Sequence, residues 1–462
     1  MNGKRVALSL ASVAACALPA DARAQGFGLN EIGSCAVGRG FAVTAATCDD
    51  ASVLFWNPAA ATELPGVSVY AGGASVGVTS DFTEDFTRRE FEGDVPKEFP
   101  PHLFASYHPS RRVALGLGVY VPYGLTSQWR SDFPGRFSAR KAALATVYAQ
   151  PNLAVDIVPG KFSIGGGPVI GHSSVELIQG LDLSTQVLSG TTRFAQIGVP
   201  RGTQFGEASV EGDAVAVGFN VGAKWRPTPK LEIGARYLSK VNFKYQEGEV
   251  EFRQTPTNLI LGGALPPAIP AGASVDALVA GAFVRGPLVT QRVQTQIAHP
   301  AQGQVGLGYA IGESTTLSVD YAWIGWHAFK ELPFTFLGPA APQSRVIIED
   351  YDDSHAVRAG IEHRLFDAIP LRAGFSAVSS PAPDVTVTPL LPDQDRRNYS
   401  LGFGLPISRY MLDFGYLRVD TDGRRGRVVE RNEDRSETAE QLNTGFYRLD
   451  ASIFSLSLRA QF

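Results

Sequence analysis

Apolar and polar residues alternate along most of this chain, and the alternation continues to the last residue. In the final segment the apolar positions are Phe454, Leu456, Leu458, Ala460 and Phe462, with serine, arginine and glutamine between them. Residues 215–225 repeat the pattern with valine, phenylalanine and tryptophan at every second position. A period of two over segments of about ten residues is typical of half-buried β-strands.

The alternation predicts about fourteen strands, an even number with both chain ends on one side. They span residues 66–79, 100–108, 113–124, 139–157, 162–177, 213–226, 231–254, 289–311, 315–332, 353–366, 369–380, 393–407, 411–420 and 445–462. Most intervening segments are alternately long and short, for example 80–99 and then 109–112, or 178–212 and then 227–230. Long outer loops and tight periplasmic turns are typical of outer-membrane barrels.

A soluble sandwich or barrel would bury the apolar faces, whereas an outer-membrane barrel exposes them to lipid and keeps a polar lumen. Strands of about ten residues match a tilted bilayer crossing. Charged residues occupy the other face, at Lys224, Glu232, Arg236, Arg358 and Glu362. We therefore expect an all-β fold, a transmembrane antiparallel β-barrel. Its last strand must pair with its first, because an open edge in lipid leaves backbone groups unbonded. A change of phase near Ile453 and Phe454 suggests a β-bulge.

Residues 25–65 lack the alternation. A barrel of this size encloses a wide lumen, and an outer membrane that excludes toxins cannot leave it open. We therefore expect residues 25–65 to form a compact plug, or hatch, inside a barrel of residues 66–462.

The first 24 residues have the features of a secretory signal peptide. Lys4 and Arg5 precede an apolar stretch, and Ala22-Arg23-Ala24 offers a cleavage site before Gln25. A competing lipoprotein-type site lies before Cys16. Cys35 and Cys48 would be the mature cysteines, either as one disulfide or as two buried thiols. The net charge of −4 gives no indication of a nucleic-acid partner.

Several segments closely resemble the FadL-type outer-membrane transporters, which take up long-chain fatty acids or aromatic hydrocarbons. The resemblance is carried by "GFGLNEIGSCAVGRGFA", "DDASVLFWNPAAATEL", "VPYGLTSQW", "HPAQGQVGLGYAI" and "PDQDRRNYSLGFG". It implies a monomeric, plugged barrel of fourteen strands in the outer membrane of a Gram-negative bacterium, transporting without an energy source of its own.

The resemblance also indicates candidate site residues. Asn57, Pro58 and Ala59 would form the turn where the hatch meets the wall, and Phe27, Leu29 and Phe55 either line the ligand pocket or form the hatch core. Family members that carry fatty acids hold the carboxylate with basic side chains. Here His172 falls on one such position and Pro333 on another, with Lys330 nearby, so the sequence also allows an uncharged ligand.

Pro122, Tyr123 and Gly124 are the candidates for a lateral opening. Proline cannot donate to a sheet ladder, and glycine weakens a strand or marks a bulge. The resemblance implies that a gap in the wall there would release solute sideways into the bilayer. The alternative is that Pro122 ends a strand near the loop rim. The loops 178–212 and 255–288 are candidate collectors of solute, because the second is unusually apolar. The alternative is that the second loop packs on its neighbour as a lid, and the two roles can coexist.

We therefore expect passive transport of hydrophobic compounds such as long-chain fatty acids or related lipids. The alternatives are an aromatic-hydrocarbon channel and a general diffusion porin or structural barrel. The sequence "GASVG" (73–77) matches a nucleophile-elbow pattern, but it lies inside a predicted strand without a following helix. We therefore expect no enzyme, cofactor or metal. Acidic and basic loop residues in 349–354 and 420–427 are expected to face divalent cations and lipopolysaccharide.

Overall fold

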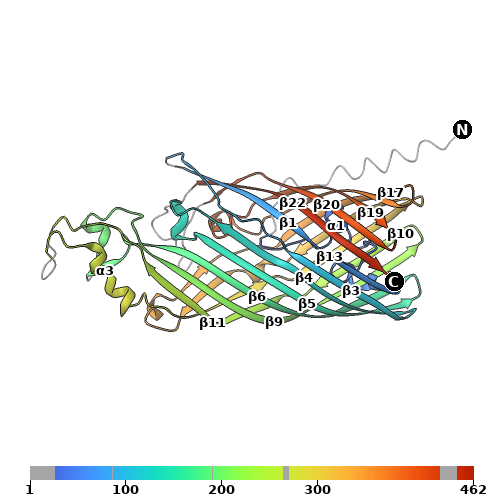
Figure 1. The fold of residues 1–462 in the computed structure, drawn as a ribbon, viewed down its shortest axis with the longest axis horizontal. Coiled ribbons are helices and arrows are strands. Elements are labelled where there is room, and N and C mark those ends of the chain that lie inside the picture. The colour runs from blue at the N-terminus through green and yellow to red at the C-terminus, as the bar shows by residue number, and fades with distance from the viewer. Residues whose placement is uncertain (1–25, 86, 190, 264–269, 427–444) are drawn as a thin grey trace.

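The computed structural model describes residues 26–462 except 86, 190, 264–269 and 427–444. Within this part of the chain, fourteen antiparallel spans form one closed barrel, as the alternation predicts (Figure 1). The predicted signal peptide, both cleavage sites and parts of the loops 255–288 and 421–444 lie outside the described residues.

Nine spans are single strands along their whole length, and a tenth, β9, pairs in turn with two shorter strands. The single strands are β1 (Val67–Glu84), β3 (Pro101–Ser110), β4 (Val113–Gln128), β5 (Lys141–Val158), β6 (Phe162–Asp182), β18 (Ile369–Val378), β19 (Arg396–Ile407), β20 (Tyr410–Thr421) and β22 (Gly445–Gln461), and β9 is Gln204–Thr228.

The other four spans are interrupted; two of them are predicted from the sequence as continuous strands (231–254 and 289–311), and two extend into a segment predicted as a loop (333–352). They consist of β10 (Leu231–Leu238) with β11 (Val241–Gln254), β12 (Gln291–His299) with β13 (Gln302–Ile311), β14 (Thr315–Ile324) with β15 (Glu331–Phe336), and β16 (Arg345–Ile348) with β17 (Ser354–Leu365). The break at Pro300 has a local cause, since proline cannot donate to the ladder.

The first and last strands close the barrel. β1 and β22 pair without interruption from Ser68–Gln461 to Glu84–Gly445. Val67 and Phe462 exchange two backbone hydrogen bonds, of 3.1 and 2.9 Å. The regular carboxyl end of the chain is therefore a strand held at the closing seam.

The side chains of the wall alternate as the sequence predicts. Apolar residues such as Val217, Val319 and Leu456 are exposed on the outside, whereas Lys224, Arg236 and Arg358 are buried in the lumen. The predicted bulge near Ile453 is wrong, because the register of β22 is continuous there. The phase of apolar residues changes because Leu449, Ala451 and Ile453 face an apolar cavity in the lumen.

The segment before β1 lies inside the barrel and contains α1 (Ser34–Gly38), α2 (Val53–Trp56) and the 3-10 helix η1 (Pro58–Glu63) (Figure 1). A disulfide joins Cys35 to Cys48. α1 packs against β18, β19, β20 and β22, and η1 packs against β4, β5, β6 and β9. The hatch therefore reaches across the lumen and contacts opposite sectors of the wall.

Inward-facing glycines let the wall approach the hatch backbone closely. A Cβ atom on Gly222 would overlap Asn57, and one on Gly374 would overlap the backbone of Arg39 and Gly40. Other wall glycines in close contact with the hatch are Gly165, Gly234, Gly306, Gly308, Gly360, Gly402 and Gly415. The small residues on the polar face of the strands thus form the seat of the hatch.

Short turns connect the strands at the end that carries the carboxyl terminus, and larger loops extend from the other end (Figure 1). The loops contain β2 (Glu90–Glu92), η2 (Pro134–Phe137), β7 (Val187–Ser189), β8 (Thr192–Arg193), η3 (Phe194–Ile197), α3 (Val275–Val284), η5 (Ala341–Gln343), η6 (Asp384–Thr386) and β21 (Arg424–Gly426), whereas η4 (Trp326–Ala328) lies at the break between β14 and β15. No helix within the described ranges has the length and apolar character needed to cross a bilayer.

The two loops predicted to collect solute share a small apolar core. Phe194 and Phe205 pack in one cluster with Leu261 and Val279 of the loop that carries α3. Ile260 and Val284 of this loop are nevertheless exposed, with about 70% of their surface accessible. These loops therefore pack on each other, as a lid would, and still expose an apolar surface to the outside.

Candidate functional site

The Asn57-Pro58-Ala59 motif joins the hatch to the wall. The side-chain Nδ2 of Asn57 donates to the carbonyl oxygens of Thr44 (2.8 Å) and Ala223 (3.1 Å), while its Oδ1 accepts from the backbone nitrogen of Ala59 at 3.3 Å. The side chain is fully buried. One amide thus caps η1, holds a second hatch segment and bonds to β9.

The amino-terminal part of the hatch completes β4 where its neighbour in the wall ends. Pairing between β3 and β4 extends from Ser110–Val113 to Leu103–Val119 and no further. Beyond it, the backbone nitrogen of Leu29 donates to the oxygen of Pro122 (2.9 Å), and that of Gly124 donates to the oxygen of Phe27 (3.0 Å). Hatch residues therefore occupy a position that a wall strand leaves vacant.

The backbone of β4 is irregular at this position. Its register with β5 shifts between Tyr120 and Tyr123. Pro122 lies inside the strand rather than at its end, so the alternative that it only terminates a strand at the loop rim is wrong. Tyr123 is fully buried, and its hydroxyl donates to the oxygen of Pro300 at 2.8 Å, across the lumen.

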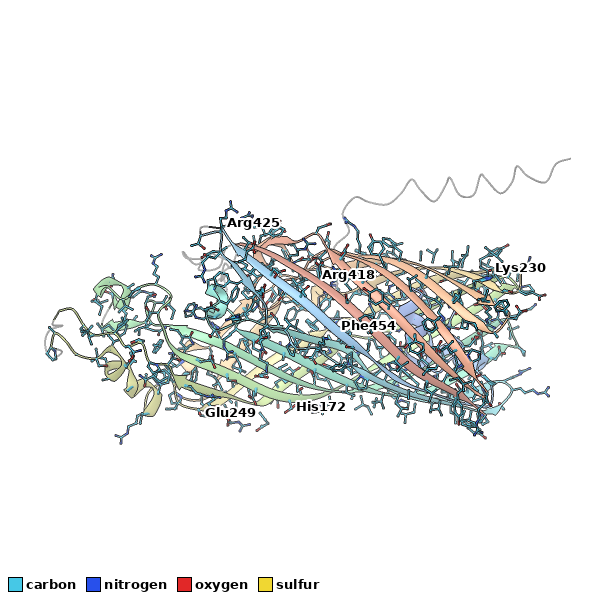
Figure 2. The ribbon with its side chains drawn as sticks, turned by 45° about the horizontal axis from the view of Figure 1, so that its top comes forward. His172, Lys230, Glu249, Arg418, Arg425 and Phe454 are labelled. Carbon is cyan, nitrogen blue, oxygen red and sulfur yellow. A yellow bond between two sulfur atoms is a disulfide. The ribbon has the colours of Figure 1, made fainter. Side chains whose placement is uncertain are left out.

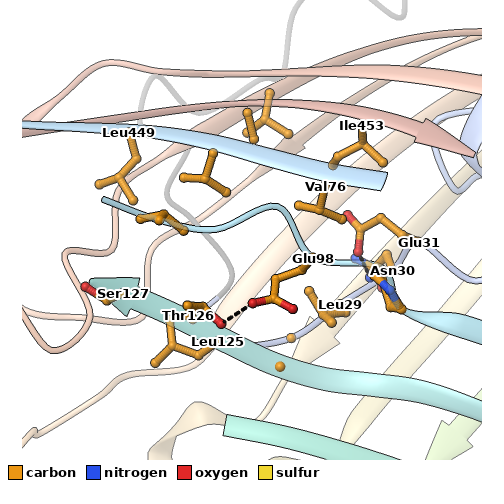
Figure 3. Close-up of a pocket in the computed structure, with 18 of the residues that line it drawn as sticks. Leu29, Asn30, Glu31, Val76, Glu98, Leu125, Thr126, Ser127, Leu449 and Ile453 are labelled. Carbon is orange, nitrogen blue, oxygen red and sulfur yellow. Dashed lines mark hydrogen bonds between the residues drawn. The ribbon is translucent and has the colours of Figure 1, made fainter. Parts of the chain in front are cut away.

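A cavity of about 520 Å³ lies beside this irregularity (Figure 3). Its apolar lining comes from the hatch and from opposite walls, and includes Leu29, Val76, Leu125, Leu391, Leu417, Val419, Leu449 and Ile453. Its polar lining includes Glu31, Glu98, Asp393, Gln394, Arg396 and Asn398. Burial raises the pKa of the Glu31 carboxyl above its usual value. A pocket of this volume, largely apolar with a few polar groups, is typical of small-molecule sites.

The cavity crosses the barrel wall. It is lined by inward-facing residues such as Asn398 and Ile453, and also by Ala145 and Val147, which are exposed on the outer face of β5. A second, apolar groove of about 920 Å³ includes the outward-facing Leu401 and Phe454. Phe99 and Pro101 line both the cavity and this groove. The lumen is therefore continuous with the apolar exterior next to the end of β3.

The three hatch residues predicted to line the pocket have different positions. Leu29 lines the large cavity. Phe27 packs on Trp326, with ring centroids 4.6 Å apart, and lines an adjacent smaller cavity of about 70 Å³ that shares Leu125 and Leu391 with the large one. Phe55 is fully buried between Tyr120 and Arg236 and belongs to the hatch core.

The two predicted cations do not line the large cavity. His172 lies on the outer face of β6, 3.7 Å from Asp213, so its predicted lumenal position is wrong (Figure 2). The neighbouring Ser173 faces the lumen instead, and a change of one residue in a strand reverses the face. Lys330 lies 3.3 Å from both Asp352 and the carbonyl oxygen of Asp350, and is held by this loop.

Sequence reasoning did not identify Gln394, Arg396 and Asn398 as site residues. The segment "PDQDRRN" was recognised as part of the resemblance, but its position opposite the hatch depends on barrel closure. Gly26 donates to Asp393 at 3.2 Å, which brings the two distant segments together.

A closed barrel, an internal hatch and an apolar cavity through the wall define an outer-membrane transport channel rather than an enzyme. Residues 15–462 match the family model described as outer membrane protein transport protein (OMPP1/FadL/TodX), and the chain belongs to this family. Its relatives are outer-membrane proteins, which places this chain in the outer membrane as well.

Individual relatives are distant but similar in length. The long-chain fatty acid transport protein of Escherichia coli is 23% identical over 85% of this chain and 86% of its own. The structure of a Pseudomonas aeruginosa FadL homologue gives a TM-score of 0.77 at 21% identity, covering 95% and 100% of the two chains. The Ralstonia pickettii toluene transporter TbuX gives 0.62 at 19% identity, covering 94% and 100%. At these identities the structural likeness shows the fold alone.

Proposed function

We propose that this protein passively carries long-chain hydrophobic compounds, such as fatty acids or related lipids, from the outer loops to the lumenal cavity and releases them sideways into the bilayer. The observation that carries the proposal is the cavity that contains both Leu29 of the hatch and Val147 of the lipid-facing surface. Transfer of an apolar solute from this path into the aqueous periplasm is unfavourable, so release into the bilayer is favoured.

The outer loops support the first step. Exposed apolar residues on the loop that carries α3 offer a surface on which a poorly soluble molecule can collect. The packed core beneath them holds the surface in place without covering it.

The hatch favours this function over a general diffusion porin. Its hydrogen bonds and glycine contacts seat it firmly across the lumen, so we expect little ion conductance in planar bilayers. The size of the cavity favours a long chain over a single aromatic ring. Its volume of about 520 Å³ is typical of pockets that bind drug-sized ligands, which are larger than one ring. We further expect the protein to act as a monomer, with its charged outer loops in contact with lipopolysaccharide.

Blocking the wall opening tests lateral release. Thr126 lines the cavity and donates to Glu98 at 2.9 Å (Figure 3). In a host strain that lacks its own fatty-acid transporter, a bulky thiol reagent on Thr126→Cys is expected to abolish uptake of radiolabelled palmitate and hexadecanol. The matched control is Val319→Cys, which is exposed to lipid on β14 and should keep full uptake when modified. Unchanged uptake by the modified Thr126→Cys protein would show that solute leaves by another route.

A further inference from the structure

The cavity holds more carboxylates than cations. Within the described residues that line it, Arg396 is the one basic side chain, whereas Glu31, Glu98, Asp393 and Asp450 are acidic. Arg396 is already engaged, because its Nη2 lies 3.4 Å from both Asp393 Oδ1 and the carbonyl oxygen of Gly26. A fatty-acid anion would therefore lose its hydration without gaining a free cation, which is costly in a buried site.

Neutral hydrogen-bonding groups in the same lining are left without partners. The Oε1 of Gln394 accepts from Thr421 Oγ1 (2.6 Å) and the backbone nitrogen of Leu449 (3.4 Å), while its Nε2 has no hydrogen-bond partner among the described residues. Asn398 donates to Ser376 Oγ at 2.9 Å, and its Oδ1 is likewise without a partner. Gln394 and Asn398 are 2% and 5% exposed.

Of these two unpaired atoms, Gln394 Nε2 is a hydrogen-bond donor and Asn398 Oδ1 is an acceptor. An unpaired polar atom at this depth costs free energy that a ligand group can recover by bonding to it. A hydroxyl or a primary amide can both accept and donate, whereas an ionised carboxylate can only accept.

We propose that the cavity selects long-chain compounds with an uncharged hydrogen-bonding head group, of the alcohol or primary-amide class, over fatty-acid anions. The proposal rests on the transport function proposed above and names the substrate class of the same cavity. Gln394 supplies the donor and Asn398 the acceptor, while the valine, leucine and isoleucine walls hold the chain.

Two ligands of equal chain length test this assignment. Binding of hexadecanol and palmitate to the purified full-length protein in detergent is compared at about pH 8, where a free carboxylic acid is ionised. We expect hexadecanol to bind about tenfold more tightly, since one recovered buried hydrogen bond is worth about 1–3 kcal/mol.

Variants at Asn398 and Gln394 test the two head-group contacts separately. Asn398→Leu removes the acceptor, which only an uncharged head group can use, and should weaken hexadecanol binding several-fold with palmitate binding unchanged. Gln394→Met removes the donor, which both head groups can use, and should weaken the binding of both ligands. Gln394→Lys adds a cation and should reverse the preference in favour of palmitate. Gln343→Lys, on an exposed loop, adds the same charge elsewhere and should leave the preference as it is.

Heat-modifiable gel mobility must first show that every variant forms a closed barrel, so that changes in binding are not caused by misfolding. Equal or tighter binding of palmitate by the unmodified protein would overturn the selection of uncharged ligands and leave the transport function standing. Failure of both ligands to bind would overturn the transport function and this assignment together.

Discussion

The side-chain amide of Asn57 donates to the carbonyl oxygen of Ala223 at 3.1 Å, and so bonds the hatch to a wall strand 166 residues further along the chain. The same amide also bonds to Thr44 within the hatch. Because the side chain is fully buried, truncating it leaves its buried partners on Thr44, Ala223 and Ala59 without these bonds, which costs free energy. The seat of the hatch therefore depends strongly on one residue.

Replacing Asn57 by alanine should loosen the hatch while the barrel stays closed. Loss of its buried hydrogen bonds is expected to lower the free energy of unfolding by about 1–3 kcal/mol. We also expect single-channel conductance in planar bilayers to rise. Asn242→Ala, at an exposed position of β11, is the control and should change neither quantity. Unchanged conductance in Asn57→Ala would mean that other contacts are sufficient to seat the hatch.

A larger residue at Gly374 should displace the other side of the hatch. A Cβ atom there overlaps the backbone of Arg39 and Gly40, so Gly374→Val cannot be accommodated without moving the segment after α1. We expect destabilisation by about 1–3 kcal/mol and increased protease cleavage within the hatch. Gly77→Val on β1 is the matched control, because the nearest atom to its Cβ would be 3.7 Å away. Equal protease resistance of the two variants would contradict the seat proposed for the wall glycines.

The stability of the hatch should depend on pH through Asp50, which lies outside the membrane-spanning strands. Burial is the main cause that raises the pKa of its carboxyl to about 6. The folded form therefore holds its proton more tightly than the unfolded chain, whose pKa is about 3.9. Stability should fall as the pH rises from about 4 to 6 and then level off, with a total loss of at most about 3 kcal/mol.

Asp50→Asn removes this titration but keeps an oxygen that can accept from the backbone nitrogen of Ser52. Thermal unfolding followed by tryptophan fluorescence should then show a more stable protein at neutral pH and a flatter pH dependence. Asp94→Asn, at an exposed position, should retain the profile of the unmodified protein. A profile of Asp50→Asn parallel to that of the unmodified protein would exclude Asp50 as its source.

The disulfide between Cys35 and Cys48 should stabilise the hatch by limiting the freedom of the unfolded segment. The cysteines are 13 residues apart, a separation for which the chain-entropy model gives about 3 kcal/mol. Replacing both by serine should lower the unfolding midpoint and increase proteolysis between α1 and α2. A reductant should have the same effect on the unmodified protein and none on the double variant. An effect of reductant on the double variant would point to a cause other than this bond.

The architecture could be predicted from the sequence because it depends on local periodicity. Lipid on one side of the wall favours apolar side chains, and the lumen on the other side favours polar ones. The side of the wall on which Val217 or Lys224 lies can therefore be predicted from its polarity, without knowing which strands pair. The absence of this period in residues 25–65, together with the wide lumen that a barrel of this size must close, predicted the hatch. Asn57 was identified through the family resemblance, and the structure explains its contacts.

The transport cavity could not be predicted in the same way, because its walls meet only when the barrel closes. His172 was assigned to the lumen because a resemblance between distant sequences does not fix the register of a strand, and an error of one residue reverses the face. The change of phase at Ile453 was interpreted as a bulge because lumenal residues are expected to be polar. Only the structure shows that Ile453 lines an apolar part of the lumen, the cavity. The alternation of side chains, with the lengths of the strands and loops, determined a membrane barrel, and the segment without alternation indicated its plug. The closing of β1 on β22 decided which residues face the solute, since packing joins groups that are hundreds of residues apart in the chain.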